Sequence, residues 1–269
     1  MKIGNREFFE TGHTYVMGIL NITPDSFSDG GKWNDLDRAL RHVEEMVAEG
    51  ADVIDIGGES TRPGYTSVSI QEETERVMPV IESVKARFDI PISLDTYRPE
   101  VLSAGIAAGV SLANDIWGLK FDDKMACVIS KSGLPCCLMH NRRKSVYQDF
   151  MQDLAADLAE TLHIAEKAGI REDRIILDPG VGFAKSYEQN LEVIGCLEEL
   201  KVLGRPILLG CSRKSVVGTA LGLPKDQRME GTLATTVVAV MKGCMFVRVH
   251  DVKENVRAIR MTEAIINQR

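Results

Sequence analysis

Residues 169–178, GIREDRIILD, contain the pattern that decides the fold. Gly169 follows a helical pattern and precedes a strand-like run from Arg174 to Leu177, which is apolar from Ile175 onward and ends at the polar residue Asp178. Glycine readily adopts the left-handed conformation that ends a helix, so it marks the helix boundary. A run that is apolar throughout, rather than alternating, predicts a parallel strand that is buried on both faces. This stretch therefore predicts the end of a helix, a buried strand and a polar strand end.

The same unit recurs eight times along the chain. The strand-like runs are Tyr15 to Leu20, Asp52 to Ile56, Pro91 to Leu94, Ser111 to Ala113, Pro135 to Met139, Arg174 to Leu177, Pro206 to Leu209 and Met245 to Val249. Between them lie helical patterns with apolar residues three or four positions apart. The glycines expected to end these helices are Gly50, Gly109, Gly133, Gly169, Gly204 and Gly243. Eight strand and helix pairs predict an α/β protein built as a (β/α)8 TIM barrel.

The organisation expected around this barrel is simple. No internal repeat, low-complexity tract or linker divides the sequence, so residues 1–269 are predicted to form a single domain. Residues 3–14, with Gly4-Asn5 and Thr11-Gly12, are expected to form a short N-terminal hairpin that closes the barrel floor. An open, doubly wound sheet is the alternative that the same alternation allows.

Composition restricts the class of protein. The chain has 269 residues, 44% hydrophobic and 26% charged, with a net charge of −7, so no basic surface for nucleic acid is expected. The N-terminus lacks the apolar core of a signal peptide, and no apolar run approaches the roughly 18 residues that span a bilayer. We expect a cytoplasmic protein without a membrane partner. The six cysteines show no CxxC spacing and are expected to be reduced core thiols.

Polar residues follow the predicted strands at their carboxyl ends. They are Asn21, Gly57-Gly58-Glu59, Asp95, Asn114-Asp115, His140, Asp178, Ser212 and His250. Active sites of (β/α)8 barrels lie at this end, which indicates an enzyme. For Asp115 and His140, a structural role such as helix capping is an equally good interpretation. The opposite, glycine-ended face has no comparable set of polar residues.

Two chemical features are expected at this rim. Arg248 and His250 lie on one side of the last strand, near Lys214, and residues 57–64 form a glycine-containing loop with Arg62. These cations predict an anion site, although Arg62 alternatively pairs with Glu59, and Arg248 or His250 with Asp251. The carboxylates and amide at the strand ends need polar partners, and a flat heterocycle with several N–H donors would satisfy them.

Four sequence blocks resemble the signatures of the dihydropteroate synthase family. They are NITPDSFSDGG (residues 21–31), DIGGESTRPG (residues 55–64), DPGVGF (residues 178–183) and SRKS (residues 212–215). The resemblance spans nearly the whole chain and implies a cytosolic TIM barrel that is usually a homodimer. It implies an enzyme that joins p-aminobenzoate to a dihydropterin pyrophosphate during folate synthesis. Cys211 and the Ser111-Leu112-Ala113 segment are mild departures from the family pattern.

The resemblance also implies roles for individual residues. The pterin is expected to be bound by Thr61, Asp95, Asn114, Ile116, Met139, Asp178 and Lys214. The pyrophosphate is expected to be bound by Asn21, Arg62, Arg248 and His250, with Asn21 also binding a Mg²⁺ cofactor. The p-aminobenzoate pocket is expected to include Phe27, Thr61, Arg62, Pro63, Phe183, Lys214 and Ser215. The residues expected to be catalytic are Asp25, Asp95 and Lys214.

The chemistry expected at this site is an SN1-like substitution. Mg²⁺ and the cationic side chains offset the charge on the departing pyrophosphate, and the electron-rich pterin supports a methylene cation. Asp25 is the candidate to stabilise that cation or to orient the incoming amine. The aniline nitrogen is neutral at pH 7, so positioning matters more than proton removal.

Two other functions are consistent with parts of this pattern. A pterin-binding barrel that transfers a methyl group from a tetrahydrofolate to a corrinoid would share Asp95, Asn114 and Asp178. That enzyme would not need the loop 61–63 or the pair formed by Arg248 and His250. A barrel that serves only as a subunit of another complex would be expected to lose polar residues at the rim, and none is missing here.

Overall fold

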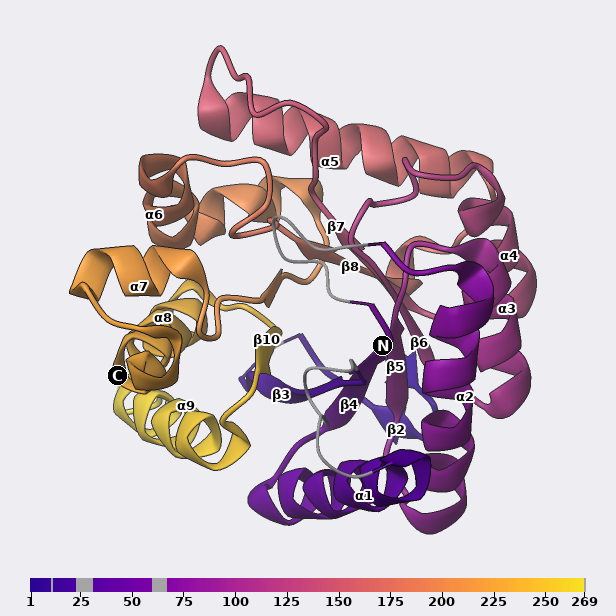
Figure 1. Ribbon diagram of the computed structural model, residues 1–269. Helices are drawn as coiled ribbons and strands as arrows, with labels where there is room; N and C mark the ends of the chain where they lie inside the picture. The colour runs from indigo at the N-terminus through magenta and orange to yellow at the C-terminus, as the bar shows by residue number, and fades with distance from the viewer. Residues whose placement is uncertain (11, 23–30, 60–66, 269) are drawn as a thin grey trace.

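The computed structural model describes residues 1–10, 12–22, 31–59 and 67–268. Eight parallel strands form one sheet in the order β8-β7-β6-β5-β4-β3-β10-β9. Their bounds are β3 (Tyr15–Asn21), β4 (Val53–Gly57), β5 (Ile92–Asp95), β6 (Leu112–Asp115), β7 (Cys136–Met139), β8 (Ile175–Asp178), β9 (Leu208–Leu209) and β10 (Phe246–Val249). A parallel bridge between Leu177 and Ile207 joins the two ends of the sheet. The sheet therefore closes into the predicted barrel (Figure 1), and the open-sheet alternative is wrong.

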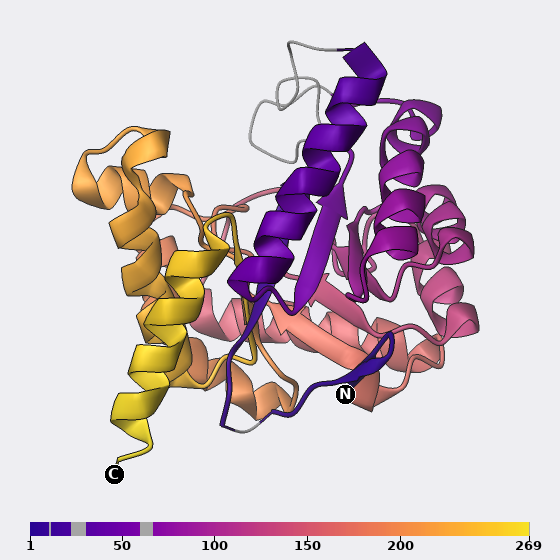
Figure 2. The ribbon, with the colours of Figure 1, turned by 90° about the horizontal axis from the view of Figure 1, so that it is seen from below.

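Helices surround the barrel (Figures 1 and 2). They are α1 (Gly31–Glu49), α2 (Ile70–Arg87), α3 (Pro99–Ala108), α4 (Lys124–Ser132), α5 (Phe150–Lys167), α6 (Tyr187–Gly195), α7 (Ser215–Leu221), α8 (Met229–Lys242) and α9 (Val252–Ile266), with short 3-10 helices η2 (Glu172–Arg174), η3 (Leu197–Leu203) and η4 (Lys225–Gln227). All six glycines expected before a strand have φ between 63° and 103°, the left-handed conformation that ends a helical segment.

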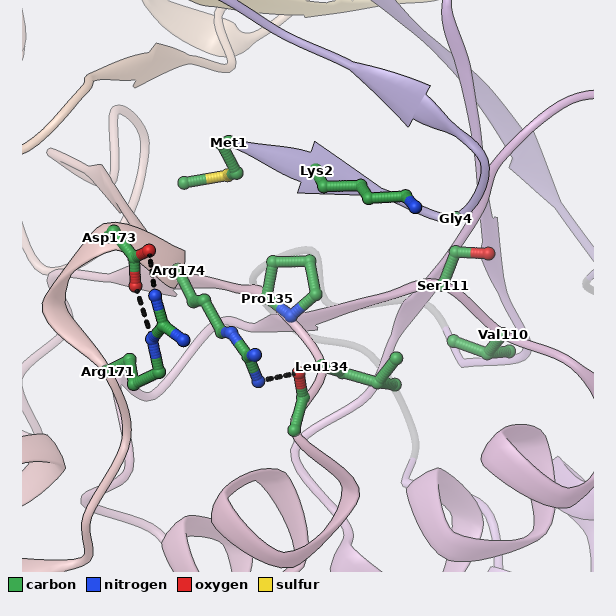
Figure 3. Close-up of a pocket in the computed structure, with 11 residues that line it drawn as sticks. Met1, Lys2, Gly4, Val110, Ser111, Leu134, Pro135, Arg171, Asp173 and Arg174 are labelled. Atoms are coloured by element: carbon green, nitrogen blue, oxygen red, sulfur yellow. Dashed lines mark hydrogen bonds and ion pairs between the residues drawn. The ribbon is translucent and has the colours of Figure 1, made fainter.

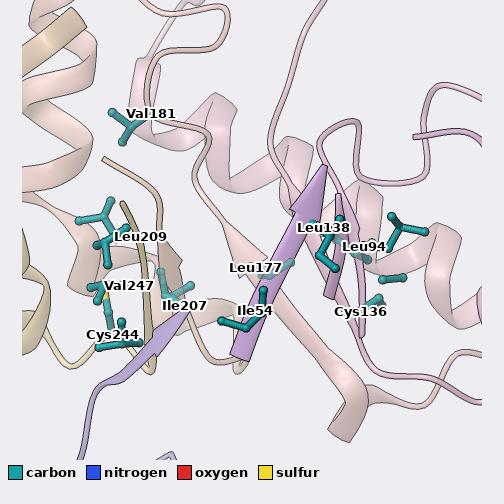
Figure 4. Packing of buried hydrophobic residues seen from close by; sticks show 14 of the residues in the cluster. Ile54, Leu94, Cys136, Leu138, Leu177, Val181, Ile207, Leu209, Cys244 and Val247 are labelled. Atoms are coloured by element: carbon teal, nitrogen blue, oxygen red, sulfur yellow. The ribbon is translucent and has the colours of Figure 1, made fainter. Parts of the chain in front are cut away.

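The core has two layers. Side chains on the outer side of the strands, such as Ile54, Leu94 and Leu138, pack beneath the helices in the larger hydrophobic cluster (Figure 4). A second cluster fills the barrel at the amino ends of the strands. Its members are Ile3, Phe8, Met17, Val53, Leu112, Cys137, Ile176, Leu208, Met245 and Phe246. This second cluster closes one end of the barrel and leaves the carboxyl ends of the strands to polar side chains.

The N-terminal hairpin lies at that closed end. Its strands β1 (Lys2–Ile3) and β2 (Arg6–Glu7) pair in antiparallel register, so the hairpin is confirmed but shorter than the expected residues 3–14. It stops at Phe8 because this ring enters the barrel floor, where its centroid lies 5.4 Å from that of Phe246 and 4.8 Å from that of Tyr15. Phe8 is 2% exposed and acts as the plug of the floor.

The cysteines largely follow the expectation of reduced core thiols. All six cysteines are free, and Cys136, Cys137, Cys211 and Cys244 are buried as expected. Cys127 is exposed, so the prediction of a core thiol is wrong there, because its position in α4 faces away from the barrel. Among residues the structure describes, no cluster of metal-binding side chains occurs and no helix is long and apolar enough to cross a membrane.

Candidate active site

The strand register brings the predicted rim residues to one level. Asp95 at the end of β5 lies opposite Gly57 of β4 and Asn114 of β6, and Asp178 of β8 lies opposite Met139 of β7. A Cβ atom added to Gly57 would lie 3.5 Å from Asp95 Cβ and 3.9 Å from Asn21 Oδ1, so these two side chains flank Gly57. The polar residues therefore form a ring around the open end of the barrel.

Arg248 lies at the centre of one half of this ring. Its Nε atom donates to Asp55 Oδ2 at 2.6 Å, and its terminal nitrogen donates to Asp95 Oδ2 at 2.7 Å. Asn114 Nδ2 also donates to Asp55 Oδ2, at 3.2 Å. Sequence reasoning assigned Arg248 to a pyrophosphate and did not include Asp55. The sequence signals for Asp55 were its place at the start of the block 55–64 and the fact that a carboxylate within an apolar strand needs a partner.

The carboxylates of this half are short of hydrogen-bond donors. Asp55 Oδ1 and Asp95 Oδ1 are buried and have no partner among the described residues. Burial raises the pKa of Asp95 to about 7, although the neighbouring Arg248 acts to lower it. A buried acceptor without a donor is costly, so a ligand with N–H groups would stabilise this half of the ring.

Asp178 and Lys214 form the other half. Asp178 Oδ1 accepts a hydrogen bond from the backbone N–H of Gly180 at 2.7 Å, and Lys214 Nζ donates to the carbonyl of Val181 at 2.5 Å. A Cβ atom on Gly210 would lie 3.5 Å from Asp178 Oδ2 and 3.7 Å from Lys214 Nζ. Both functional atoms thus face the surface that Gly210 leaves open. Burial raises the pKa of Asp178 and lowers that of Lys214.

An apolar wall stands beside the polar ring. Tyr97, Ile116 and Met139 are buried together, with Trp117 and Phe183 packed against them. The Lys214 ammonium lies 5.0 Å from the centroid of the Phe183 ring. Three of these five residues were predicted from the family resemblance, whereas Tyr97 and Trp117 were missed. A flat ring placed between this wall and the polar ring would contact both apolar and hydrogen-bonding groups.

The remaining predicted residues lie around this centre. His250 follows β10, and its Nδ1 lies 3.0 Å from Ser212 Oγ. Asp251 accepts from Arg213, and Arg248 pairs with the two ring carboxylates instead. Ser215 is exposed at the start of α7.

Two rim residues have structural partners. Asp115 accepts the backbone N–H groups of Trp117 and Leu119 at 2.8 and 2.7 Å, which fixes a turn. His140 contacts Asp157 and Lys185 instead of the ring. For both residues the structural interpretation is the one that the geometry supports.

Five predicted site residues lie outside the residues that the structure describes. They are Asp25, Phe27, Thr61, Arg62 and Pro63. Arg98 contacts residues on both sides of positions 60–66. It lies 3.1 Å from Glu59 and donates to the carbonyl of Val68 at 2.7 Å. Glu59 therefore has a buried cationic partner of its own.

A cavity among the described residues lies at the other end of the barrel. It has a volume of about 480 Å³ and is lined by residues before β6, β7 and β8, including Ser111, Pro135 and Arg174, together with the hairpin (Figure 3). Its arginines are already engaged, because Arg174 donates to the Gly133 carbonyl and Arg171 pairs with Asp173. We locate the candidate site at the carboxyl ends of the strands, where buried polar atoms are unpaired.

Known proteins match most or all of this chain. The family described as pterin binding enzyme matches residues 17–250. The dihydropteroate synthase of Clostridium beijerinckii is 58% identical over 269 residues, which cover 100% of both chains. A dihydropteroate synthase structure from Clostridium difficile, in the presence of pteroic acid, has 50% identity and a TM-score of 0.93, with 98% of each chain covered. That of Xanthomonas albilineans with 4-aminobenzoic acid has 40% identity and a TM-score of 0.91, covering 94% of this chain and 93% of that one.

Proposed function

Because the chain belongs to the dihydropteroate synthase family of pterin-binding enzymes, we propose that the polar ring described above is its pterin site. The reaction condenses p-aminobenzoate with 6-hydroxymethyl-7,8-dihydropterin pyrophosphate and releases pyrophosphate, a step of folate biosynthesis. We place the pterin here because polar side chains lie on both sides of the barrel mouth. Asp95 and Asn114 form one half of the polar ring, and Asp178 and Lys214 form the other. Together they offer acceptors and donors at one level of the barrel.

The polar ring suits the edge of a pterin. The Asp178 carboxylate accepts N–H groups from the heterocycle, and the Lys214 ammonium donates to its carbonyl group. Asp95 Oδ1, which is buried without a donor, accepts a further N–H group. Ile116, Met139 and Phe183 contact the faces of the ring from the apolar wall. The burial of these groups strengthens each hydrogen bond relative to one in water.

Arg248 has two roles in this proposal. Its guanidinium pairs with Asp55 and Asp95 and offsets the charge of these carboxylates. Its place at the end of β10, near His250, also directs positive charge toward the departing pyrophosphate. Arg62 is proposed to contribute a further cation to the pyrophosphate. Because the leaving group is stabilised, the bond to the pterin methylene carbon breaks before the amine attacks, as in an SN1-like substitution.

The p-aminobenzoate site is proposed to lie at the outer edge of the ring, toward Phe183, Lys214 and Ser215. Phe27, Thr61, Arg62 and Pro63 complete this pocket in the proposal, and Thr61 also contacts the pterin. Asp25 is proposed to stabilise the methylene cation or to orient the amine, which needs no base because an aniline nitrogen is neutral at pH 7.

A Mg²⁺ ion fits the donor set at this rim. Mg²⁺ prefers oxygen ligands and is commonly bound by one or two side chains together with substrate phosphates. The Asn21 amide oxygen lies at the end of β3 on the same side of Gly57 as the Asp95 carboxylate. Asn21 is therefore the residue proposed to hold the ion, which when bound would offset the charge of the pyrophosphate.

Assembly and location are proposed on separate grounds. Exposed apolar residues on neighbouring helices, Met241 of α8 and Met261 of α9, are 66% and 63% exposed, which supports a homodimer through this surface. Six free cysteines support a reducing compartment, the cytoplasm. Light scattering of the purified protein checks the dimer, and a monomeric mass would contradict it.

One assay tests the proposed function. The protein is incubated with the dihydropterin pyrophosphate, p-aminobenzoate and Mg²⁺, and dihydropteroate is detected by its mass. We expect product that is lost with EDTA, is restored by Mg²⁺, and is absent when the pterin lacks its pyrophosphate. No product under conditions where a known synthase is active would contradict the function. Product that persists in EDTA would contradict only the Mg²⁺ requirement.

A further inference from the structure

Next to the polar ring lies a partly buried chain of three polar side chains to which the proposed reaction assigns no role. Lys185 Nζ lies 2.9 Å from His140 Nδ1, and His140 Nε2 lies 2.8 Å from Asp157 Oδ2. The His140 side chain is fully buried, and Lys185, His140 and Asp157 come from the segment after β8, the residue directly after β7 and the helix α5. Arg142 also donates to Asp157 from the loop after β7.

The contacts determine how the protons are arranged. An ammonium has only N–H donors, so His140 Nδ1 must offer its lone pair to Lys185. The proton of the neutral imidazole is then on Nε2 and is donated to the Asp157 carboxylate. Burial lowers the pKa of His140 to about 4, which agrees with a neutral ring. The His140 imidazole, protonated on Nε2 only, thus connects the Asp157 carboxylate to the Lys185 ammonium.

The other two donors of Lys185 hold a turn. Its Nζ donates to the carbonyls of Gly180 and Phe183 at 3.0 and 3.1 Å, and the N–H of Phe183 also donates to the Gly180 carbonyl at 3.1 Å. The turn contains two glycines in the left-handed conformation, Gly180 with φ of 71° and Gly182 with φ of 86°. A Cβ on Gly180 would lie 2.1 Å from the His140 carbonyl oxygen, so the turn is pressed against β7.

The same turn orients the pterin-site groups from its other side. The Gly180 N–H fixes the Asp178 carboxylate, and the Val181 carbonyl fixes the Lys214 ammonium. Phe183, whose carbonyl Lys185 holds, contributes its ring to the apolar wall. Among the described residues, Asp178 Oδ1 and Lys214 Nζ are thus both hydrogen-bonded to a backbone segment that Lys185 contacts. Asn190 Oδ1 also holds this segment, by accepting the Gly182 N–H at 2.6 Å.

We propose that Lys185, held by His140 and Asp157, is a positioning residue that sets the turn 180–183 and thereby the geometry of Asp178, Lys214 and Phe183. This inference rests on the proposed pterin site but assigns a role to residues outside it. In this proposal Lys185 is not itself a pterin ligand. It acts through the backbone of the turn, and His140 acts through Lys185.

The test compares substitutions at both ends of the contact. Lys185→Met keeps the length of the side chain and removes its donors, whereas Lys167→Met changes an exposed lysine on α5 and is the control. His140→Asn keeps an acceptor where Nδ1 lies, whereas His140→Leu removes it. Binding of 6-hydroxymethyl-7,8-dihydropterin is measured by calorimetry, and exchange of the Gly180 and Gly182 amides by NMR.

We expect Lys185→Met and His140→Leu to weaken pterin binding at least tenfold and to speed exchange of both glycine amides. His140→Asn and Lys167→Met should stay within about threefold of the parent. The double variant Lys185→Met/His140→Leu should bind pterin no more weakly than whichever of the two single variants binds it more weakly. The reason is that both substitutions act on the same turn. If Lys185→Met binds pterin like the parent, or if His140→Asn loses as much as His140→Leu, the inference is wrong. A parent protein that does not bind pterin contradicts the proposed function instead, and the amide exchange then still tests the effect of Lys185 on the turn.

Discussion

The two ends of the barrel are built from the same eight strands and have opposite chemistry. At the amino end, Phe8 and its neighbours fill the interior with apolar side chains that are almost completely buried. At the carboxyl end, the interior holds Asp55, Asp95 and Asp178 with Arg248 and Lys214, and two of the carboxylate oxygens have no partner among the described residues. The floor is arranged for stability, whereas the rim has buried carboxylate oxygens that the proposed pterin would pair with N–H donors.

The largest expected effect belongs to the floor. Phe8→Ala removes a ring that is 2% exposed and leaves a cavity, which should lower the free energy of unfolding by about 3–5 kcal/mol. Phe9 is 61% exposed, so Phe9→Ala should change it by less than about 0.5 kcal/mol. Urea unfolding measures both. The folded fraction of Phe8→Ala should bind pterin like the parent, and a large loss of affinity would show that floor and rim are not separable.

Arg248 lies at the rim, but we expect it to contribute to stability as well as to pterin binding. Removing it leaves Asp55 and Asp95 as buried carboxylates without their cation, so Arg248→Met should lower the unfolding free energy by about 3 kcal/mol as well as weaken pterin binding. Adding Asp55→Asn to that variant should restore part of the stability, as measured by thermal unfolding. A variant as stable as the parent would mean that the ion pairs contribute nothing to folding.

His250 should separate the two substrate groups more cleanly than Arg248. It contacts Ser212 and lies outside the ring of carboxylates, so His250→Ala should weaken binding of the pyrophosphate-bearing pterin roughly tenfold, about 1.4 kcal/mol. Binding of the pterin without pyrophosphate should not change. Calorimetry with the two ligands provides the comparison, and equal losses for both would refute the assignment of His250 to the pyrophosphate.

The smallest expected effect is a pH dependence with opposite signs for binding and stability. Burial raises the pKa of Asp95 to about 7, so lowering the pH from 7 to 6 protonates the acceptor and should weaken pterin binding about fivefold. The folded state then binds this proton more tightly than the unfolded state. The contribution of Asp95 to stability is therefore full below the unfolded pKa and is lost as the pH rises through 7.

The pH dependence attributed to Asp95 needs a control because Lys185 also titrates. Burial lowers its pKa to about 7, so it titrates in the same range. Asp95→Asn should remove the part of the pH dependence that is due to Asp95, whereas exposed Asp37→Asn should leave the profile unchanged. A profile that persists in Asp95→Asn would assign the titration to another group.

The sequence predicted the frame of the molecule well because the relevant signals are local. The apolar runs, six of them preceded by a helix-ending glycine, set the starts of the strands, and the first polar residue after a run marks its end, as at Asp178. Differences are small. Strand β9 is limited to Leu208–Leu209, shorter than expected at its start, where Pro206 has no N–H to pair.

The missing parts of the candidate site depend on contacts across the barrel. Asp55 belongs to an apolar run, and its partner Arg248 is 193 residues away, so no local pattern pairs them. Lys185 follows the turn that it fixes, but its partner His140 is 45 residues earlier. Tyr97 and Trp117 read as ordinary aromatic residues, and only the fold shows that they share one wall. Such pairings are set by tertiary structure rather than by spacing.

The division between a stable floor and a strained rim is tested most directly at Asp178. Asp178→Asn keeps the shape of the side chain but replaces an acceptor with a donor, and it removes a carboxylate whose pKa is raised by burial. Calorimetry should show pterin binding weakened about 30- to 1,000-fold, which corresponds to roughly 2–4 kcal/mol. Thermal unfolding of the same sample should show a midpoint at or slightly above that of the parent. A variant that binds pterin like the parent, or that unfolds, would contradict the account, because Asp178 would then belong to the structural part of the barrel.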